Sequence, residues 1–165
     1  MKGCIRIRYM AKTLWVSDIQ SGSCTGDLVE LKGWIKRHRS SGKIVFMTIR
    51  DSTGEVQCVA KKTDMDELEY ESIKNALIES SIELTGIVKS DARAPGGHEI
   101  SINKAIIIGG VNAENPFPIT ESAMEQTEGG ETEFLLDNRH LYLRTGRMTT
   151  MLKIRSTIFG SIHSY

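Results

Sequence analysis

The stretch that decides the fold is VELKGWIKRHRSSGKIVFMTIRDSTGEVQCV, residues 29–59. Apolar and polar side chains alternate in and around it in three runs, residues 28–36, 43–51 and 55–61, which is the period of a strand with one buried face. Residues 52–54, Ser-Thr-Gly, are typical of a turn between the last two runs. We therefore predict three consecutive strands that form a β-meander.

The residues that follow predict one helix and two more strands. Asp64 followed by Glu67 resembles an N-terminal capping pair, and apolar residues then recur at helical spacing, so we expect a helix over 65–79. Strand-like patterns return at 82–89 and 99–108, on either side of a turn-rich segment. A mainly β chain with five strands and one helix between strands 3 and 4 predicts an OB-fold, a partly open barrel. An SH3-like barrel is the alternative, but this helix position is unusual for it.

The charges of the chain balance overall and are segregated locally. Among 165 residues, 21 Lys and Arg balance 21 Asp and Glu, which excludes bulk attraction to nucleic acid or anionic lipid. Residues 29–50 carry six cations and one acid, residues 112–137 carry seven acids with no Lys or Arg, and residues 138–165 carry five cations with no acid. The proline-containing acidic segment indicates a linker. We accordingly divide the chain into an N-terminal extension (1–14), an OB-fold domain (15–110), an acidic hinge (111–137) and a third region (138–165).

Several functional classes leave no signature in the sequence. Three cysteines, Cys4, Cys24 and Cys58, are odd in number and lack CxxC spacing, which predicts neither a disulfide framework nor a zinc ribbon and indicates a reducing cytosol. The four histidines are scattered, so we expect no metal site. We find no phosphate-binding loop, Ser-His-Asp arrangement, signal peptide or apolar run of ~18 residues, and expect a cytoplasmic protein with no visible catalytic site. Met10 is a possible second start beside Met1.

Phe46 is the most informative residue for function. If Val45 and Met47 fill the barrel, the alternation of the strand forces Phe46 outward. It would then share a face with Arg50 and lie beside Gln57 on the next strand. An exposed ring can stack on a nucleic-acid base, an arginine can contact a phosphate, and a glutamine can read a base edge. These residues predict a binding surface for single-stranded nucleic acid.

Arg37, His38 and Arg39 add positive charge close to this face. We expect them in or next to the first turn. One alternative is that they form only a solvated basic turn. Another is that Phe46 packs against residues 36–41, or that the two faces of its strand are reversed.

Four motifs carry a resemblance to a known family. Residues 29–59 resemble the anticodon-binding OB domain of the class IIb aminoacyl-tRNA synthetases, which are the aspartyl, asparaginyl and lysyl enzymes. The motifs IESSIELTGIVKSDARAPGGHEI (78–100), FPIT (117–120) and EFLLDNRHLYLR (133–144) are similar to archaeal-type asparaginyl enzymes. Together these motifs span most of the chain in the family's order, which makes the match specific.

The resemblance implies a role for each candidate residue. Phe46 corresponds to the ring that stacks on the central anticodon base, a uridine, and Gln57 to the residue that reads the edge of that base. Arg39 corresponds to an arginine that contacts the anticodon loop, while Arg37 and Arg50 match basic positions of the same motif. The implied partner is the anticodon stem-loop of a tRNA, and neither DNA nor a membrane is expected.

The resemblance also implies a missing part. In the family, ATP, magnesium and the amino acid bind through the second and third class II motifs, which this sequence lacks, so we expect the chain alone to bind no cofactor and to be inactive. Residues 148–164 resemble the helix that opens the first motif at the family's homodimer interface, and the sequence stops inside it. We therefore expect a truncated catalytic domain to begin at 138.

Three alternatives to an asparaginyl enzyme stay open. The first is an aspartyl enzyme that charges tRNA(Asp) and possibly tRNA(Asn), since the two enzymes share the OB strands. The second is a stand-alone OB-fold RNA-binding protein, against which the run at 133–144 argues. The third is a related protein that makes asparagine, although such proteins tend to lack the OB domain.

Overall fold

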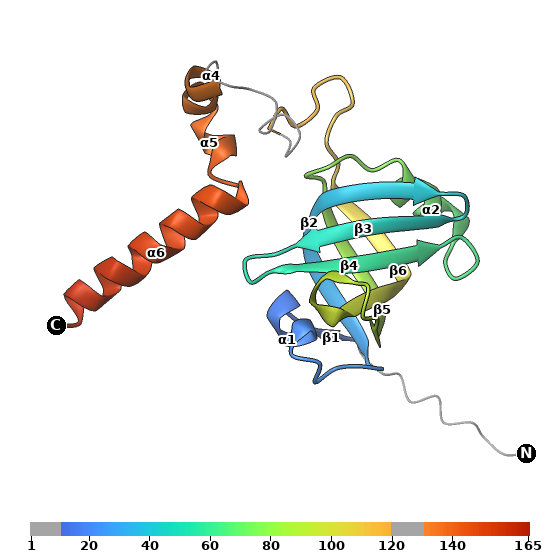
Figure 1. The fold of residues 1–165 in the computed structure, drawn as a ribbon. Coiled ribbons are helices and arrows are strands. Elements are labelled where there is room, and N and C mark those ends of the chain that lie inside the picture. The colour runs from blue at the N-terminus through green and yellow to red at the C-terminus, as the bar shows by residue number, and fades with distance from the viewer. Residues whose placement is uncertain (1–10, 120–130) are drawn as a thin grey trace, which may run out of the picture. The chain divides into compact units, whose positions relative to one another are not determined.

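The chain folds into two compact units, one ending at Pro116 and one beginning at Phe117. The structure, a computed structural model, describes residues 11–119 and 131–165. The first unit is a β-barrel and the second is helical (Figure 1).

Five long strands form the barrel, as the alternation in the sequence predicts. They are β2 (Leu28–Ser41), β3 (Ile44–Arg50), β4 (Glu55–Lys61), β5 (Ser81–Ser90) and β6 (His98–Gly109), with a short strand β1 (Lys12–Thr13) added beside β2. The order β1-β2-β3-β4-β6-β5 is closed by pairing of β5 with β2. All pairs are antiparallel except β1 with β2 and β4 with β6. This is the predicted OB-fold topology, and the SH3-like alternative is wrong.

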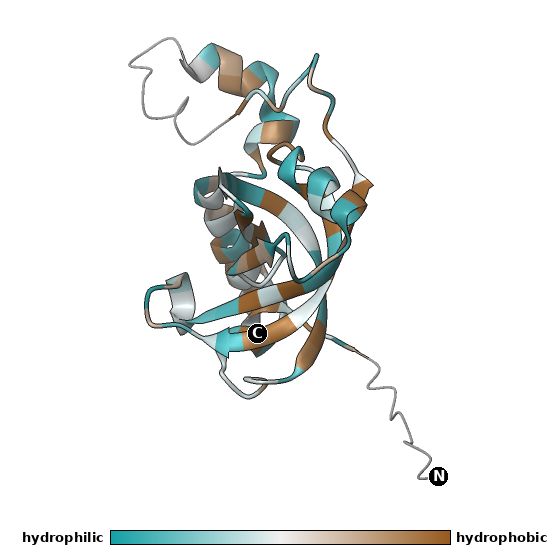
Figure 2. Cartoon of the chain, turned by 90° about the vertical axis from the view of Figure 1, so that its right-hand side faces the viewer, coloured by the Kyte–Doolittle hydropathy of each residue, from teal (hydrophilic) through white to brown (hydrophobic). Residues whose placement is uncertain are grey.

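The barrel interior is filled by the apolar faces of these strands. Brown and paler or teal segments alternate along the strands in Figure 2, because successive side chains point to opposite sides. Val45 and Met47, which the alternation places inside the barrel, are buried, and so are Val56, Cys58 and Ala60 of β4. The core includes Val29, Leu31, Ile35, Val45, Met47, Ile49, Val56, Cys58, Ala60, Ile82, Leu84, Ile100 and Ile102. Each large aliphatic side chain of this kind contributes about 1.5–3 kcal/mol when it is removed from water.

Strand β2 is longer than the sequence indicates. We expected it to end at Lys36, but it continues to Ser41, and Gly42 makes the turn into β3 with a φ of +60°. The register shifts after Ile35, which pairs with Ile49, because the next pair is Arg37 with Thr48. Lys36 is therefore the extra residue of a β-bulge. The expectation that residues 37–39 lie in or next to a turn is wrong, since they lie within the strand.

Two helices complete the first unit. Helix α2 (Glu67–Lys74) lies between β4 and β5 as predicted, but it is shorter than the expected 65–79 and its N-cap is Asp66, not Asp64. The Asp66 carboxylate accepts hydrogen bonds from the backbone N–H groups of Leu68 and Glu69, at 2.9 and 3.4 Å. Tyr70 and Ile73 of α2 belong to the barrel core. Helix α1 (Val16–Gln20), which the sequence analysis missed, is held by a 2.8 Å hydrogen bond from the Val16 N–H to the Asp51 carboxylate.

The second unit contains three described helices. They are α4 (Glu131–Asp137), α5 (Arg139–Tyr142) and α6 (Gly146–His163). Helix α6 confirms the helix expected over 148–164, and it exposes its apolar side chains along much of its length. The proposed hinge at 111–137 falls partly outside the described residues, and its last turns are helical in α4.

Candidate nucleic-acid interface

Two rows of side chains cross the outer face of β2, β3, β4 and β6. Paired residues of neighbouring strands point to the same side of a sheet, so strand register defines each row. The first row contains Arg39, Phe46, Val59 and Ser101, and the second contains Arg37, Thr48, Gln57 and Glu99. All of these residues except Ser101 line a groove of about 810 Å³, which is also bordered by the loop between β5 and β6.

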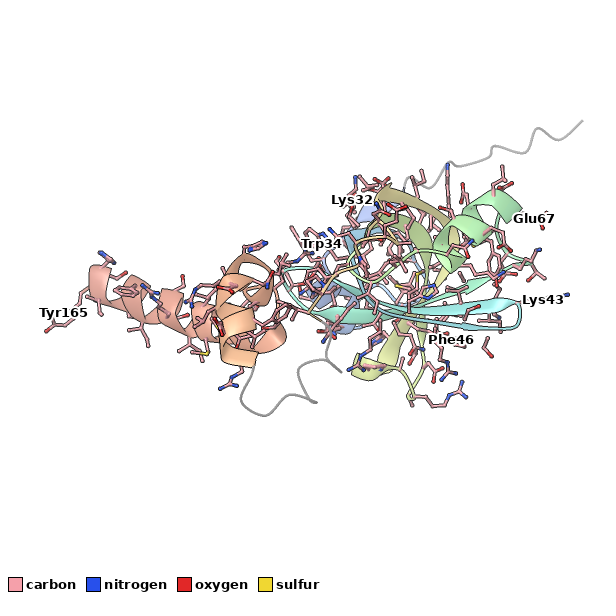
Figure 3. The ribbon with its side chains drawn as sticks, turned by 90° about the horizontal axis from the view of Figure 1, so that it is seen from above. Lys32, Trp34, Lys43, Phe46, Glu67 and Tyr165 are labelled. Carbon is pink, nitrogen blue, oxygen red and sulfur yellow. The ribbon has the colours of Figure 1, made fainter. Side chains whose placement is uncertain are left out.

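Phe46 lies at the centre of this face, outside the barrel core. Its neighbours along β3, Val45 and Met47, are buried inside the barrel, so the predicted face assignment is confirmed and the reversed one is wrong. The guanidinium carbon of Arg39 lies 5.6 Å from the centroid of the Phe46 ring, within the range of a cation–π contact. Figure 3 shows Phe46 on the opposite side of the barrel from Lys32 and Trp34. One side of the ring therefore has a cationic neighbour within an open groove.

The bulge at Lys36 aims the two arginines at this groove. In a regular strand Arg37 and Arg39 would share a face with Ile35, which is fully buried. The extra residue reverses the alternation, so both arginines pair with outward residues of β3. Lys36 itself forms an ion pair with Glu55 on β4, with 2.7 Å between Nζ and Oε1. A local backbone irregularity thus assembles the basic part of the groove.

Gln57 is tied to an acidic residue that the sequence analysis missed. Its side-chain Nε2 donates a 3.1 Å hydrogen bond to Oε2 of Glu99. Gln57 and Glu99 are register partners in the parallel pair β4 and β6. Glu99 lies in the motif at 78–100, but only the pairing of β6 with β4 would have brought it to Gln57.

Arg50 does not line the groove. Its Nη2 lies 3.0 and 2.8 Å from the two carboxylate oxygens of Glu79, and both side chains are largely buried. The Glu79 backbone N–H also donates to the Ile35 carbonyl at 2.7 Å, next to the bulge. Glu79 has a φ of +70°, which costs a residue other than glycine about 1–2 kcal/mol. The structure therefore places Arg50 in a pair that holds the α2–β5 connection against the barrel.

The rim of the groove adds two cations and a carboxylate. Lys61 lies at the end of β4, and Asp91 and Arg93 lie on the loop between β5 and β6. Arg93 donates from Nε and Nη2 to the Asp91 carboxylate at 3.2 and 3.1 Å. These side-chain hydrogen bonds, with one from the Arg93 backbone N–H, hold the pKa of Asp91 below its ordinary value. The groove thus carries four cationic and two acidic side chains in a protein with no net charge.

The described part of the chain contains no cluster of three or more His, Cys, Asp or Glu residues that could hold a metal ion. Cys24 and Cys58 are buried free thiols, and burial raises the pKa of each. Among the described helices, none is both long enough and apolar enough to cross a membrane.

The barrel is similar in sequence to a family of nucleic-acid-binding domains. The family described as "OB-fold nucleic acid binding domain" matches residues 29–108, which cover nearly all of β2 to β6. The asparagine–tRNA ligase of Thermoplasma acidophilum is 40% identical over 152 residues, which cover 92% of this chain and 33% of that protein. The corresponding ligase of Thermococcus kodakarensis is 43% identical over 140 residues, which cover 85% of this chain and 30% of that protein.

Solved structures agree with these similarities. The asparaginyl-tRNA synthetase of Pyrococcus horikoshii, complexed with asparaginyl-adenylate, matches with a TM-score of 0.80 and 35% identity over 94% of this chain and 34% of that chain. An aspartyl-tRNA synthetase from Entamoeba histolytica has a TM-score of 0.77, but its 18% identity shows the fold alone. The chain spans about a third of the length of these relatives. Residues 29–108 therefore match the OB-fold nucleic acid binding domain family, within a chain that is similar over most of its length to a part of asparagine–tRNA ligases in identity and, for the Pyrococcus horikoshii enzyme, in fold.

Proposed function

We propose that the groove binds the anticodon loop of a tRNA. The observation that supports this most strongly is the row in which Phe46 and Arg39 lie side by side, with Gln57 on the next strand of the same face. The ring stacks on the central anticodon base, Gln57 reads the edge of that base, and Arg39 contacts the loop. Stacking of one base on an aromatic side chain is worth about 1–3 kcal/mol.

The arrangement favours an RNA loop over a regular duplex. A base can lie on Phe46 only if it is unstacked from its neighbours, and loops present bases in this way. Arg37, Arg39 and Lys61 offer phosphate contacts along the groove, while the carboxylates of Asp91 and Glu99 repel phosphate. We assign the cations to the backbone of the loop and the acidic residues to the neighbourhood of its bases. Arg50, paired with Glu79, has a structural role in this proposal.

We further propose that the whole protein attaches asparagine to its tRNA with ATP, through an aminoacyl-adenylate. The support is the similarity to asparagine–tRNA ligases over 92% of this chain. By the same similarity the whole protein acts as a cytoplasmic homodimer and uses ATP and magnesium. The described residues do not gather the carboxylate donors of a magnesium site, so they do not fit that role and no step of the reaction is assigned to them. We expect the chain alone to show no ATP–pyrophosphate exchange.

The test is binding of the isolated anticodon stem-loop of an asparagine tRNA, which presents the anticodon bases in a single-stranded loop. We expect saturable binding that is lost when the three anticodon bases are replaced. A DNA hairpin of the same sequence tests whether binding requires the ribose of RNA. Equal affinity for all hairpins would contradict anticodon recognition and favour a general RNA-binding role.

A further inference from the structure

We propose that Glu99 is a positioning residue that sets the orientation of the Gln57 amide and thereby makes the groove select uridine over cytidine at the central base. The inference rests on the proposed function and adds a residue to it. The observation that carries it is the 3.1 Å hydrogen bond from Gln57 Nε2 to Glu99 Oε2 on the groove face.

The chemistry of the two side chains fixes which end of the amide faces Glu99. A glutamine amide has one acceptor end, Oε1, and one donor end, Nε2, whereas a carboxylate only accepts. If the Gln57 amide turned over, its oxygen would face the Glu99 oxygen, and two acceptors would repel each other. Glu99 therefore holds the amide in a single orientation.

The position of Glu99 is itself fixed by the barrel. Glu99 pairs with Gln57 on β4 and with Lys89 on β5, so β6 is held on both sides at this point. Ile100, the next residue, is fully buried in the core. The carboxylate is therefore presented to Gln57 by a strand that cannot shift without disturbing the core.

A fixed amide distinguishes the two pyrimidines because they present opposite patterns. Next to its shared O2 acceptor, uridine offers a donor at N3 and an acceptor at position 4, whereas cytidine offers an acceptor at N3 and a donor at position 4. An amide pairs with either pattern, but only after turning over between them. After one N–H is used by Glu99, Gln57 still has an N–H and its carbonyl oxygen for the base. A locked amide thus accepts one pyrimidine, whereas a free amide accepts both.

The experiment compares the full 165-residue chain and its variants in binding two stem-loops that differ only in a central U or C. We expect the unmodified chain to prefer U by about 5–150-fold, the range of a good two-bond base contact. In Glu99→Gln the new amide can donate or accept, so either orientation of Gln57 is satisfied. The preference for U should then fall at least about fivefold, while affinity for the U hairpin falls only about twofold because half of the amide orientations are wrong.

Two controls separate positioning from direct contact and from loss of structure. Glu83→Gln removes a carboxylate from β5 that pairs with Lys32 and does not line the groove, and it should change neither affinity. In a Gln57→Ala background, Glu99→Gln should cause no further loss of preference, because Glu99 acts through Gln57. In the free protein, nitrogen–proton NMR should show the two Gln57 amide protons becoming more alike and exchanging faster with water in Glu99→Gln.

The other possible results would refute either the positioning role of Glu99 or the proposed function itself. An unchanged preference for U in Glu99→Gln, or a loss that persists in the Gln57→Ala background, would refute the positioning role. If the unmodified chain binds neither hairpin, the proposed function fails, and the inference fails with it.

Discussion

Replacement of Phe46 by alanine distinguishes a binding role from a packing role, because the two roles predict different losses of folding and of binding free energy. Phe46 lies outside the core cluster, and the guanidinium carbon of Arg39 lies 5.6 Å from the centroid of its ring. Loss of an exposed cation–π contact costs about 0.5–1 kcal/mol of folding free energy, which corresponds to a fall of about 2–8 °C in the Tm of a domain of this size. Loss of base stacking costs about 1–3 kcal/mol of binding free energy, a roughly 5- to 150-fold weaker Kd. A core phenylalanine would instead cost about 3–5 kcal/mol of stability.

The assay is fluorescence anisotropy with a labelled anticodon stem-loop, run beside thermal unfolding of each variant. Trp34→Ala is the matched control, because Trp34 is an aromatic residue with 43% exposure that does not line the groove. We expect Phe46→Ala to weaken binding and Phe46→Tyr to retain most of it, while Trp34→Ala leaves binding unchanged. A Phe46→Ala variant that loses several kcal/mol of stability yet binds RNA normally would show that the ring packs rather than stacks.

Three further predictions concern the same face and its support. Gln57→Ala should relax preference at the central anticodon base more than it lowers affinity, and an equal loss on all loop sequences would remove Gln57 from base reading. Binding should weaken with salt, and a plot of log affinity against log salt concentration should have a slope of roughly −0.7 per phosphate contact. The slope should become shallower by that amount in each of the variants Arg37→Gln, Arg39→Gln and Lys61→Gln. An affinity that does not depend on salt would contradict phosphate contacts. Glu79→Gln should destabilise the fold by about 1–3 kcal/mol, because it weakens a largely buried charged pair, and should leave RNA affinity unchanged; increased affinity would show that Arg50, once released, binds RNA.

The sequence predicts the barrel well because alternation reports directly on burial. Val45, Met47 and Ile49 leave no other buried face for β3, and the helix between β4 and β5 is marked by apolar spacing. Helix α1 was missed because its five residues are too few to show a period, and a tertiary hydrogen bond from Val16 to Asp51 supports it. The N-cap is Asp66 and not the predicted Asp64, because neighbouring acidic residues give the same local sequence signal.

The site is predicted less completely because its parts depend on contacts between distant residues. The face of Phe46 follows from its own strand, but the orientation of Arg37 and Arg39 depends on a bulge that no local pattern marks. Arg50 and Phe46 are both even-numbered residues of β3, so alternation alone places them on the same outer face. Arg50 instead forms an ion pair with Glu79, which lies far along the chain. Glu99 reaches Gln57 only through a parallel pairing of β4 and β6 that alternation cannot specify. The roles of these residues in binding RNA stay predictions.

The bulge at Lys36 lets a single strand serve two purposes that can vary independently. Upstream of the bulge, the odd-numbered side chains face the barrel interior and are constrained by core packing. Downstream of it, the odd-numbered side chains Arg37 and Arg39 face the groove, where we propose that RNA binds. If the groove binds RNA as proposed, substitutions at 37 and 39 change that binding without altering the core. A change that made the strand pairing regular while Lys36 is kept would do the reverse, because it would turn both guanidinium groups towards the apolar interior without altering either arginine. In the proposed binding of RNA, the irregular pairing at Lys36 thus matters as much as the identity of the arginines.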